Sequence, residues 1–304
     1  MKPIKPEVLQ PANYGLPSLT CAQTSLMQAT QVMDQFGQMR SIQIPNERPL
    51  TLYIDKQEVV TLMTLGAAPE LLALGFIRNQ KIAINAGAIE SITVDWEVDS
   101  VAIKTRPNKP IKSLKDAKRT VTTGCGQGSV YGDLMEHIEQ IQLPSHQQAR
   151  VSQQTIYDII DVMRKQDSVH REAGSVHGCA LFQGSQFLVG FEDVGRHNAV
   201  DTIAGWMWMH GVDAQGMTGA NKIFYSTGRL TSEMVMKAAQ MGIPAIVSRN
   251  GVTQMGLDLA NRLGMTLFGR AGNRHFLCYS GFDRFDGDVS PPAADQVMQT
   301  SHDL

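Results

Sequence analysis

The chain has 304 residues, of which 42% are hydrophobic and 18% are charged, and its formal net charge is −2. This balance is ordinary for a globular protein and gives no overall basic field, so we expect neither a nucleic acid nor a membrane as a partner. No apolar run approaches the roughly 20 residues that span a bilayer, and the N-terminus lacks the apolar segment of a signal peptide, which favours a cytoplasmic location.

The first part of the chain predicts a tail followed by a small β-rich domain. Residues 1–40 mix Pro, Gln, Met and Thr without clear periodicity, so we interpret them as an N-terminal tail or a loosely attached arm. Leu50, Leu52 and Ile54 alternate with polar residues, which is typical of a half-buried strand. The β-rich domain, residues 41–120, is expected to hold a strand at 47–55, a short helix at 68–75 and a strand pair at 91–98 and 100–105.

The second part predicts a cysteine loop and then alternating strands and helices. Residues 121–150 hold a glycine-rich loop and a short helical pattern. A stronger helix follows Ser152, and the domain that it opens is expected to cover residues 151–282. Further helices are expected at 198–210, 231–241 and 253–263, and strands at 179–182, 186–191, 222–226, 243–248, 265–268 and 275–279. This order predicts an α/β layer structure with a mainly parallel sheet, and the polar residues 283–304 predict a disordered tail.

Four strand-length apolar runs of this domain each end in a short loop that carries arginine. If the strands lie side by side, their loops gather guanidinium groups, backbone N–H groups and helix N-termini on one rim. A single arginine after a strand is commonly a solvated loop residue, but four in succession favour a ligand with several phosphate groups. The residues expected to hold it are Arg196, Arg229, Arg249, Arg270, Gly272, Asn273 and Arg274, with His197, Gly269 and Ala271 as their neighbours in the same loops.

Cys125 is the sharpest candidate for a reactive thiol. Gly124, Gly126 and Gly128 surround it, so the backbone can adopt conformations closed to other residues and admit a bulky partner. Neighbouring hydroxyl groups and the helical pattern just downstream would favour the thiolate, which is the reactive form. The alternative is a cysteine that merely lies in a flexible loop. The four cysteines of the chain are far apart, which gives neither a zinc-ribbon spacing nor a disulfide framework.

Two histidines flank the predicted hairpin. His177 and His197 could form an acid/base group or, together with Cys179, supply three zinc ligands of a hydrolase. The alternative is that they hold loops together by hydrogen bonds, which we favour because no second close pair of ligands exists. Asp201, one helical turn beyond His197, could reach the same rim or bind an amide group of a ligand.

Four segments of the α/β domain form a specific combination: EDVGRHNAVD (192–201), STGRLTSEMVMKAA (226–239), GIPAIVSRN (242–250) and TLFGRAGNRHFLCY (266–279). An R-H-N-A-V-D segment followed by an S-x-G-R helix start is far more specific than a lone glycine motif. Together these segments resemble the FdhD/NarQ family of formate dehydrogenase accessory sulfurtransferases. The resemblance covers roughly residues 45–282, and Cys125 lies where that family has its cysteine loop.

The resemblance implies a cytoplasmic sulfur carrier. A cysteine desulfurase would load persulfide onto Cys125, and the sulfur would pass to the molybdenum cofactor, a bis(molybdopterin guanine dinucleotide), before that cofactor enters formate dehydrogenase. The pyrophosphates of this bound substrate fit the arginine rim, and no metal ion of the protein's own is expected. The implied fold is a three-layer cytidine-deaminase-like domain with a smaller N-terminal domain, usually in a homodimer. The alternative function is a chaperone that binds the molybdenum cofactor without transferring sulfur.

The chain departs from the family pattern at a few positions. Gly128 stands where many relatives have the second cysteine of C-x-x-C, which excludes a two-thiol mechanism at this site. Thr202 replaces the lysine that follows the H-N-A-V-D segment, Val252 replaces a proline, and residues 78–80 replace the S-E-G segment. The chain also lacks the H-x-E and P-C-x-x-C signature of zinc deaminases, so deaminase chemistry is not expected.

Overall fold

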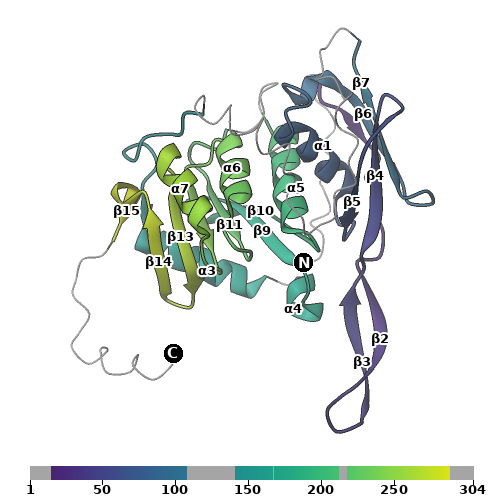
Figure 1. Ribbon diagram of the computed structural model, residues 1–304, viewed down its shortest axis with the longest axis horizontal. Helices are drawn as coiled ribbons and strands as arrows, with labels where there is room; N and C mark the ends of the chain where they lie inside the picture. Colours follow the sequence, from purple (N-terminus) through teal and green to yellow (C-terminus); the bar gives the residue numbers. More distant parts are fainter. Residues whose placement is uncertain (1–14, 108–140, 167, 212–217, 288–304) are drawn as a thin grey trace.

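The computed structural model describes residues 15–107, 141–166, 168–211 and 218–287. A five-stranded sheet from the first part of the chain and a six-stranded sheet from the second part lie on either side of two neighbouring helices, α1 (Pro69–Asn79) and α5 (Arg196–Met209) (Figure 1). The expected α/β class is therefore confirmed. Cys125 and its glycine-rich loop lie outside the described residues.

The five-stranded sheet has the order β1-β6-β7-β4-β5. In β4 (Arg48–Ile54), the alternating Leu50, Leu52 and Ile54 are all buried, as the sequence predicted. Helix α1 packs against this core and begins at Pro69. Proline is tolerated there because the N–H groups of a first turn have no partner within the helix, so the N–H that proline lacks costs no hydrogen bond. The other strands are β1 (Ser18–Leu19), β5 (Gln57–Thr64), β6 (Ile89–Asp95) and β7 (Ser100–Thr105), and a short 3-10 helix, η1 (Ala86–Ala88), precedes β6.

The six-stranded sheet has the order β10-β9-β11-β12-β13-β14. Only the two central pairs, β11 with β12 and β12 with β13, are parallel, so the expectation of a mainly parallel sheet is wrong. The reason is that tight turns reverse the chain between β9 and β10 and between β13 and β14. The strands are β9 (His177–Gln183), β10 (Gln186–Asp193), β11 (Ile223–Ser226), β12 (Ala245–Ser248), β13 (Thr266–Gly272) and β14 (His275–Ser280).

Helices cover both faces of the six-stranded sheet. Cys179 and Leu181 of β9 pack with α5, α6 (Ser232–Gln240) and α7 (Gln254–Leu263). The alternate residues Ala180 and Phe182 pack with α3 (Gln153–Lys165) on the opposite face. Successive side chains of a strand point to opposite faces, so a sheet covered on both sides needs a continuous apolar run. Within the described residues, no helix is long and apolar enough to cross a membrane.

Two glycines allow α1 and α5 to touch through their backbones. A Cβ placed on Gly75 would lie 1.6 Å from the carbonyl oxygen of Asp201, and one on Gly205 would lie 2.0 Å from that of Leu71. No side chain fits in either place, because these neighbours are backbone atoms. Helix α5 therefore joins the two parts of the molecule, and its Trp208 packs in the core of the five-stranded sheet.

Three segments differ from the sequence-based expectations. A hairpin of β2 (Met27–Met33) and β3 (Met39–Pro45) extends away from the rest of the molecule (Figure 1), mostly within the residues interpreted as a tail or an arm. Strand β13 continues to Gly272 through residues expected to form a loop, because β14 pairs with it. Two short elements, η3 (Phe282–Arg284) and β15 (Phe285–Asp286), extend past 282 because the buried Arg284 side chain donates to several backbone carbonyls. Strand β15 pairs with β8 (Val151–Ser152).

Candidate functional site

Two buried serines end neighbouring strands at the edge where the arginine loops leave the six-stranded sheet. Ser226 of β11 and Ser248 of β12 are paired in register, and neither is exposed. The N–H of Gly228 donates to Oγ of Ser226 at 3.0 Å, and Oγ of Ser248 donates to the carbonyl of Gly228 at 2.6 Å. Because buried hydroxyl groups need partners, each serine fixes the turn beyond its strand. The loop of Arg229 is thereby held against the loop of Arg249.

Asn250 joins three of the arginine loops. Its N–H donates to Oγ of Ser248 at 3.0 Å, and its side-chain Nδ2 donates to the carbonyl of Thr227 at 3.0 Å. Its carbonyl accepts the N–H of Arg270 at 2.9 Å. Gly269 leaves room for this contact, because a Cβ there would lie only 3.0 Å from the carbonyl oxygen of Asn250. The loops after β11 and β12 and the end of β13 therefore form one hydrogen-bonded edge.

The end of β13 turns Arg270 outward. Arg270 has a left-handed backbone, with φ of 53°, where the β13–β14 register shifts between Gly269 and Gly272. Such a conformation in a residue other than glycine costs on the order of 1–3 kcal/mol and persists only where the surroundings hold it. The side chain of Arg270 is exposed, whereas Ala271 is 1% exposed in the core on the α3 side. Asn273, with φ of 51°, forms the exposed turn into β14.

Positive charge gathers around His177, the first residue of β9. A Cβ on Gly228 would lie 3.4 Å from Nδ1 of His177 and 3.5 Å from Cδ of Arg196, so these residues are close neighbours. Burial, and then the charge of Arg196, neighbouring histidines and Arg229, lower the pKa of His177. The imidazole is therefore neutral at pH 7, with one nitrogen able to donate a hydrogen bond and the other able to accept one.

Four arginines of this edge are not held in ion pairs within the described part of the chain. Arg196, Arg229, Arg249 and Arg270 form no ion pair with another described residue. The last three are exposed, and Nε of Arg196 is buried without a hydrogen-bond partner among the described residues. The N-cap residue of helix α5 is Gly195, which has no side chain to cap the first N–H groups. Guanidinium groups and uncapped helix N–H groups suit an anion such as a phosphate group.

The guanidinium groups do not all face one point. The charge of Arg249 acts on the hydroxyl of Tyr225, whose ring packs on the α3 side of the sheet, although burial still raises the pKa of this tyrosine to about 12. Arg274 lies over the ring of Tyr157 in α3, 5.6 Å from its centroid. The structure therefore brings the backbones of the arginine loops together and distributes their side chains along the edge.

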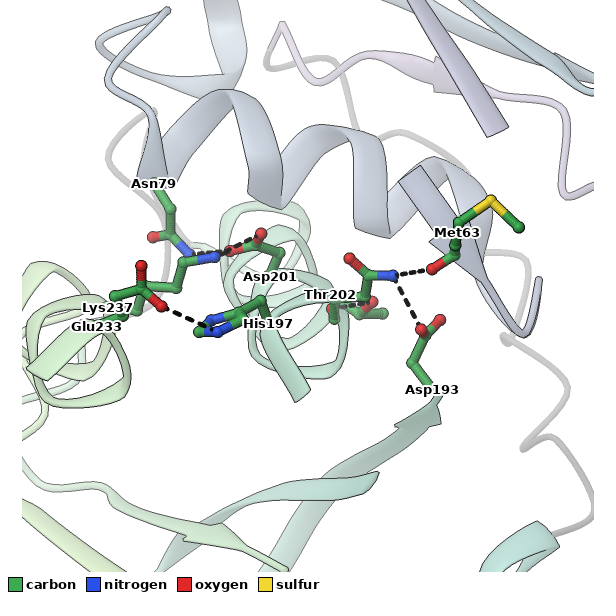
Figure 2. A network of polar contacts seen from close by, with 9 residues as sticks. Met63, Asn79, Asp193, His197, Asp201, Thr202, Glu233 and Lys237 are labelled. Atoms are coloured by element: carbon green, nitrogen blue, oxygen red, sulfur yellow. Dashed lines mark hydrogen bonds and ion pairs between the residues drawn. The ribbon is translucent and has the colours of Figure 1, made fainter. Parts of the chain in front are cut away.

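His197 and Asp201, one turn apart on α5, face α6 (Figure 2). Nε2 of His197 lies 3.0 Å from Oε2 of Glu233, and the hydrogen bond from His197 lowers the pKa of that carboxyl group. Asp201 is 3% exposed and accepts hydrogen bonds from Nζ of Lys237 at 2.7 Å and from Nδ2 of Asn79 at 2.6 Å. The expectation that Asp201 could reach the rim is therefore wrong, since it links α1, α5 and α6 inside the protein.

Asp193, the last residue of β10, anchors the start of α5 (Figure 2). Its buried carboxylate accepts four hydrogen bonds, from Thr64, Leu65, Gly195 and Asn198. Burial outweighs these bonds and raises the pKa of Asp193 to about 6. Asn198 also donates to the carbonyl of Met63 at 2.7 Å. The helix turn that begins with Arg196 is thus fixed to the end of β5.

The described thiols are poor nucleophiles. Burial raises the pKa of Cys179 to about 12, and burial also raises the pKa of Cys278. The pKa of the more exposed Cys21 is raised by partial desolvation and by the carboxylate of Glu70. The protonated thiol, which is the less reactive form, therefore prevails at all three positions at neutral pH.

The geometry gives no support to the zinc hypothesis for His177, Cys179 and His197. Over the described ranges, no group of three His, Cys, Asp or Glu side chains is arranged to hold a metal ion. Cys179 belongs to an apolar cluster with its Sγ 3.8 Å from Oγ of Ser226, and His197 contacts Glu233. These are contacts of the kind that hold loops and helices together.

The sequence patterns did not single out three residues that join the edge by hydrogen bonds, Ser226, Ser248 and Asn250. The available signal was local: a serine at a strand end with glycine two residues later is typical of a hydroxyl-stabilised turn. A Ser-Arg-Asn sequence at the end of the next strand repeats part of that signal. The bonds between the loops left no signal, because their partners are far apart in the chain.

The chain is similar to proteins of known sequence and structure. The profile of the FdhD/NarQ family matches residues 45–286. The sulfur carrier protein FdhD of Halalkalibacterium halodurans is 26% identical over 251 residues, which cover 81% of this chain and 91% of that protein. The sulfur carrier protein FdhD of Listeria innocua is 24% identical over 241 residues, or 79% of this chain and 90% of that protein. The crystal structure of a candidate formate dehydrogenase accessory protein from Desulfotalea psychrophila has a TM-score of 0.68 at 26% identity, over 87% of this chain and 100% of that one.

Proposed function

The chain belongs to the FdhD/NarQ family, and on that premise we propose that it is a sulfur carrier in the maturation of a formate dehydrogenase. The relatives named sulfur carrier protein FdhD support this role. In the proposal, a cysteine desulfurase supplies sulfur to Cys125, and the sulfur then passes to a bis(molybdopterin guanine dinucleotide) molybdenum cofactor held as substrate. The observation that carries the proposal is the hydrogen-bonded edge of arginine loops, whose Arg229, Arg249 and Arg270 form no ion pair with a described residue.

The pyrophosphate groups of this substrate are the proposed ligands of the edge. A guanidinium group offers two parallel N–H donors, which match two phosphate oxygens, and it keeps its charge at all physiological pH values. Arg229, Arg249 and Arg270 are exposed and free of ion pairs with described residues, so binding would not have to break an existing pair. Gly272, which has open space where a Cβ would stand, would let a phosphate approach the backbone.

The proposed loading step is an exchange between thiolates. The thiolate of Cys125 attacks the outer sulfur of the desulfurase persulfide, an S–S bond forms on Cys125, and the donor cysteine leaves as a thiolate. No oxidant or reductant is consumed. Cys125 lies outside the described residues, so its support comes from the glycines around it in the sequence and from the raised pKa of the three described thiols.

The remaining parts of the proposal follow from the family. The protein would act in the cytoplasm as a homodimer, between a cysteine desulfurase and the catalytic subunit of a formate dehydrogenase. The six-stranded sheet with helices on both faces would be the cytidine-deaminase-like domain. The proposed sulfur transfer requires no metal ion bound permanently by the protein.

Sulfur loading is tested by intact-mass measurement after the purified protein is incubated with a desulfurase and cysteine. The wild type and the matched control Cys179→Ala should gain the mass of one sulfur atom, and Cys125→Ala should gain none. An adduct that persists in Cys125→Ala would remove this cysteine from the carrier role. A wild type that binds the cofactor and never accepts sulfur would favour the chaperone alternative.

The phosphate edge is tested separately with GDP, which carries the guanine and pyrophosphate of the proposed substrate. Calorimetric titration should give weaker binding to Arg270→Ala than to the wild type. Arg164→Ala is the matched control, because Arg164 is an exposed arginine of α3 that pairs with Asp161. Equal affinities for the wild type and Arg270→Ala would exclude Arg270 from the site.

A further inference from the structure

Asn250 is exposed, yet its N–H, its Nδ2 and its carbonyl all form hydrogen bonds with other residues of the protein. Its N–H bonds to Ser248 within its own loop, its side chain bonds to Thr227 in the loop of Arg229, and its carbonyl bonds to the backbone of Arg270. It therefore contacts the backbone of two arginine loops and directly follows the arginine of a third. An uncharged side chain in this position cannot itself neutralise an anion, but it can hold in place the loops whose arginines do so.

The contact with Arg270 has the strictest geometry. Arg270 has a left-handed backbone, and the carbonyl of Asn250 accepts its N–H. Next to it, Gly269 has no Cβ, so the same carbonyl oxygen can approach closely. If the Asn250 loop moved away, Arg270 would lose this hydrogen bond and could relax toward the more favourable right-handed or extended backbone. Its long side chain would then leave from the edge in a different direction.

The side chain of Asn250 links that loop to the neighbouring loop of Arg229. The bond from Nδ2 to the carbonyl of Thr227 is the link that depends on the identity of residue 250, because the other two bonds use backbone atoms. Thr227 is in turn bonded to Gly178 of β9 through both its N–H and its hydroxyl group. The side chain of Asn250 thus connects its loop to the sheet through Thr227.

We propose that Asn250 is a positioning residue, which holds the backbones of the Arg229 and Arg270 loops in the arrangement that binds an anionic ligand. It acts through these arginines and makes no contact with the ligand. This inference rests on the proposed function, because it concerns the same phosphate-binding edge.

The test is calorimetric titration of the folded full-length protein with GDP at several salt concentrations. Asn250→Ala removes one hydrogen bond, so we expect about fivefold weaker binding. Because every charge of the edge remains, the dependence of affinity on salt should match that of the wild type. Arg270→Ala should weaken binding and also reduce the salt dependence. Asn261→Ala, an exposed asparagine near the end of α7, is the matched control and should bind as the wild type does.

A double-mutant cycle separates positioning from a general loss of structure. If Asn250 acts through Arg270, Asn250→Ala should weaken GDP binding much less in the Arg270→Ala background than in the wild type. Asn250→Ser, which keeps a shorter donor, is the second variant and should fall between the wild type and Asn250→Ala.

Two results would overturn the inference for different reasons. In the first, Arg270→Ala weakens GDP binding while Asn250→Ala and Asn250→Ser bind GDP as the wild type does, or the losses of GDP affinity from the two positions simply add in the double mutant. Asn250 then has no positioning role, and the proposed function stands. If the wild type itself binds no GDP, the phosphate edge of the proposed function fails, and the role of Asn250 fails with it.

Discussion

Replacing Gly205 by alanine should destabilise the protein, although the same change normally strengthens a helix. The alanine Cβ would lie 2.0 Å from the carbonyl oxygen of Leu71, where ordinary contacts begin at 3.4 Å. Helices α1 and α5 would have to separate by about 1.4 Å, the difference between these distances (3.4 − 2.0), at the point where α5 joins the two sheets. A second backbone atom, the N of Gly75, lies 2.9 Å from the same Cβ position, so sliding α5 sideways gives little relief.

The magnitude follows from two opposing effects. Alanine gains about 1 kcal/mol over glycine inside a helix. Overpacking of a well-packed core costs about 1–3 kcal/mol, and backbone neighbours that cannot rotate away favour the upper end of that range or more. We therefore expect a net loss of about 2 kcal/mol in the free energy of unfolding, which is a substantial fraction of the stability of an ordinary domain.

Urea unfolding followed by circular dichroism measures this loss. The midpoint should fall while the slope of the transition stays the same, because the surface exposed on unfolding is nearly unchanged. Gly251→Ala is the matched control, since its Cβ would meet nothing within 4 Å and its backbone is not left-handed. Its unfolding free energy should stay within about 0.5 kcal/mol of the wild type. A Gly205→Ala variant as stable as the wild type would show that α1 and α5 do not need this close backbone contact.

Three further predictions concern buried charge, pH and thiols. Lys237→Ala leaves the buried Asp201 without its cation and should cost about 3–5 kcal/mol of unfolding free energy, whereas a loss below about 1 kcal/mol would mean that water replaces the lysine. The pKa of His177 in the folded protein is lowered from its usual value of 6.5. Between the folded pKa and 6.5, the unfolded chain therefore binds more protons than the folded protein does. The free energy of unfolding should rise as the pH increases through this interval. His177→Gln should flatten the rise, and an unchanged pH profile of urea midpoints would contradict the assignment. In a strain that lacks the gene, Cys179→Ala should restore formate dehydrogenase activity, because the buried Cys179 serves packing. Cys125→Ala should not restore it, because it removes the proposed sulfur carrier. Rescue by Cys125→Ala would mean that the protein works without carrying sulfur.

Local sequence patterns predicted most of the individual elements correctly. The alternation of Leu50, Leu52 and Ile54 predicted β4, and the helical spacing that follows Ser152 predicted α3, which this serine caps through a hydrogen bond from the N–H of Thr155. Gly264 has the left-handed backbone expected where α7 stops. These predictions succeed because periodicity and capping depend on residues within one or two turns of each other.

The sequence alone also identified the family, since the R-H-N-A-V-D segment and the following S-x-G-R helix start are each contiguous in the chain, and the family profile matches residues 45–286. It indicated that arginine follows each of four strands. Only the tertiary structure decided which of the named residues share the edge and which are buried. Asp201 is drawn into an ion pair with Lys237, Ala271 into the core, and Arg274 onto the ring of Tyr157, because their partners come from helices distant in sequence. The links through Ser248 and Asn250 and the backbone contact between α1 and α5 likewise arise from atoms brought together only by folding, where hydrogen-bond geometry and packing, and not local propensity, determine the result.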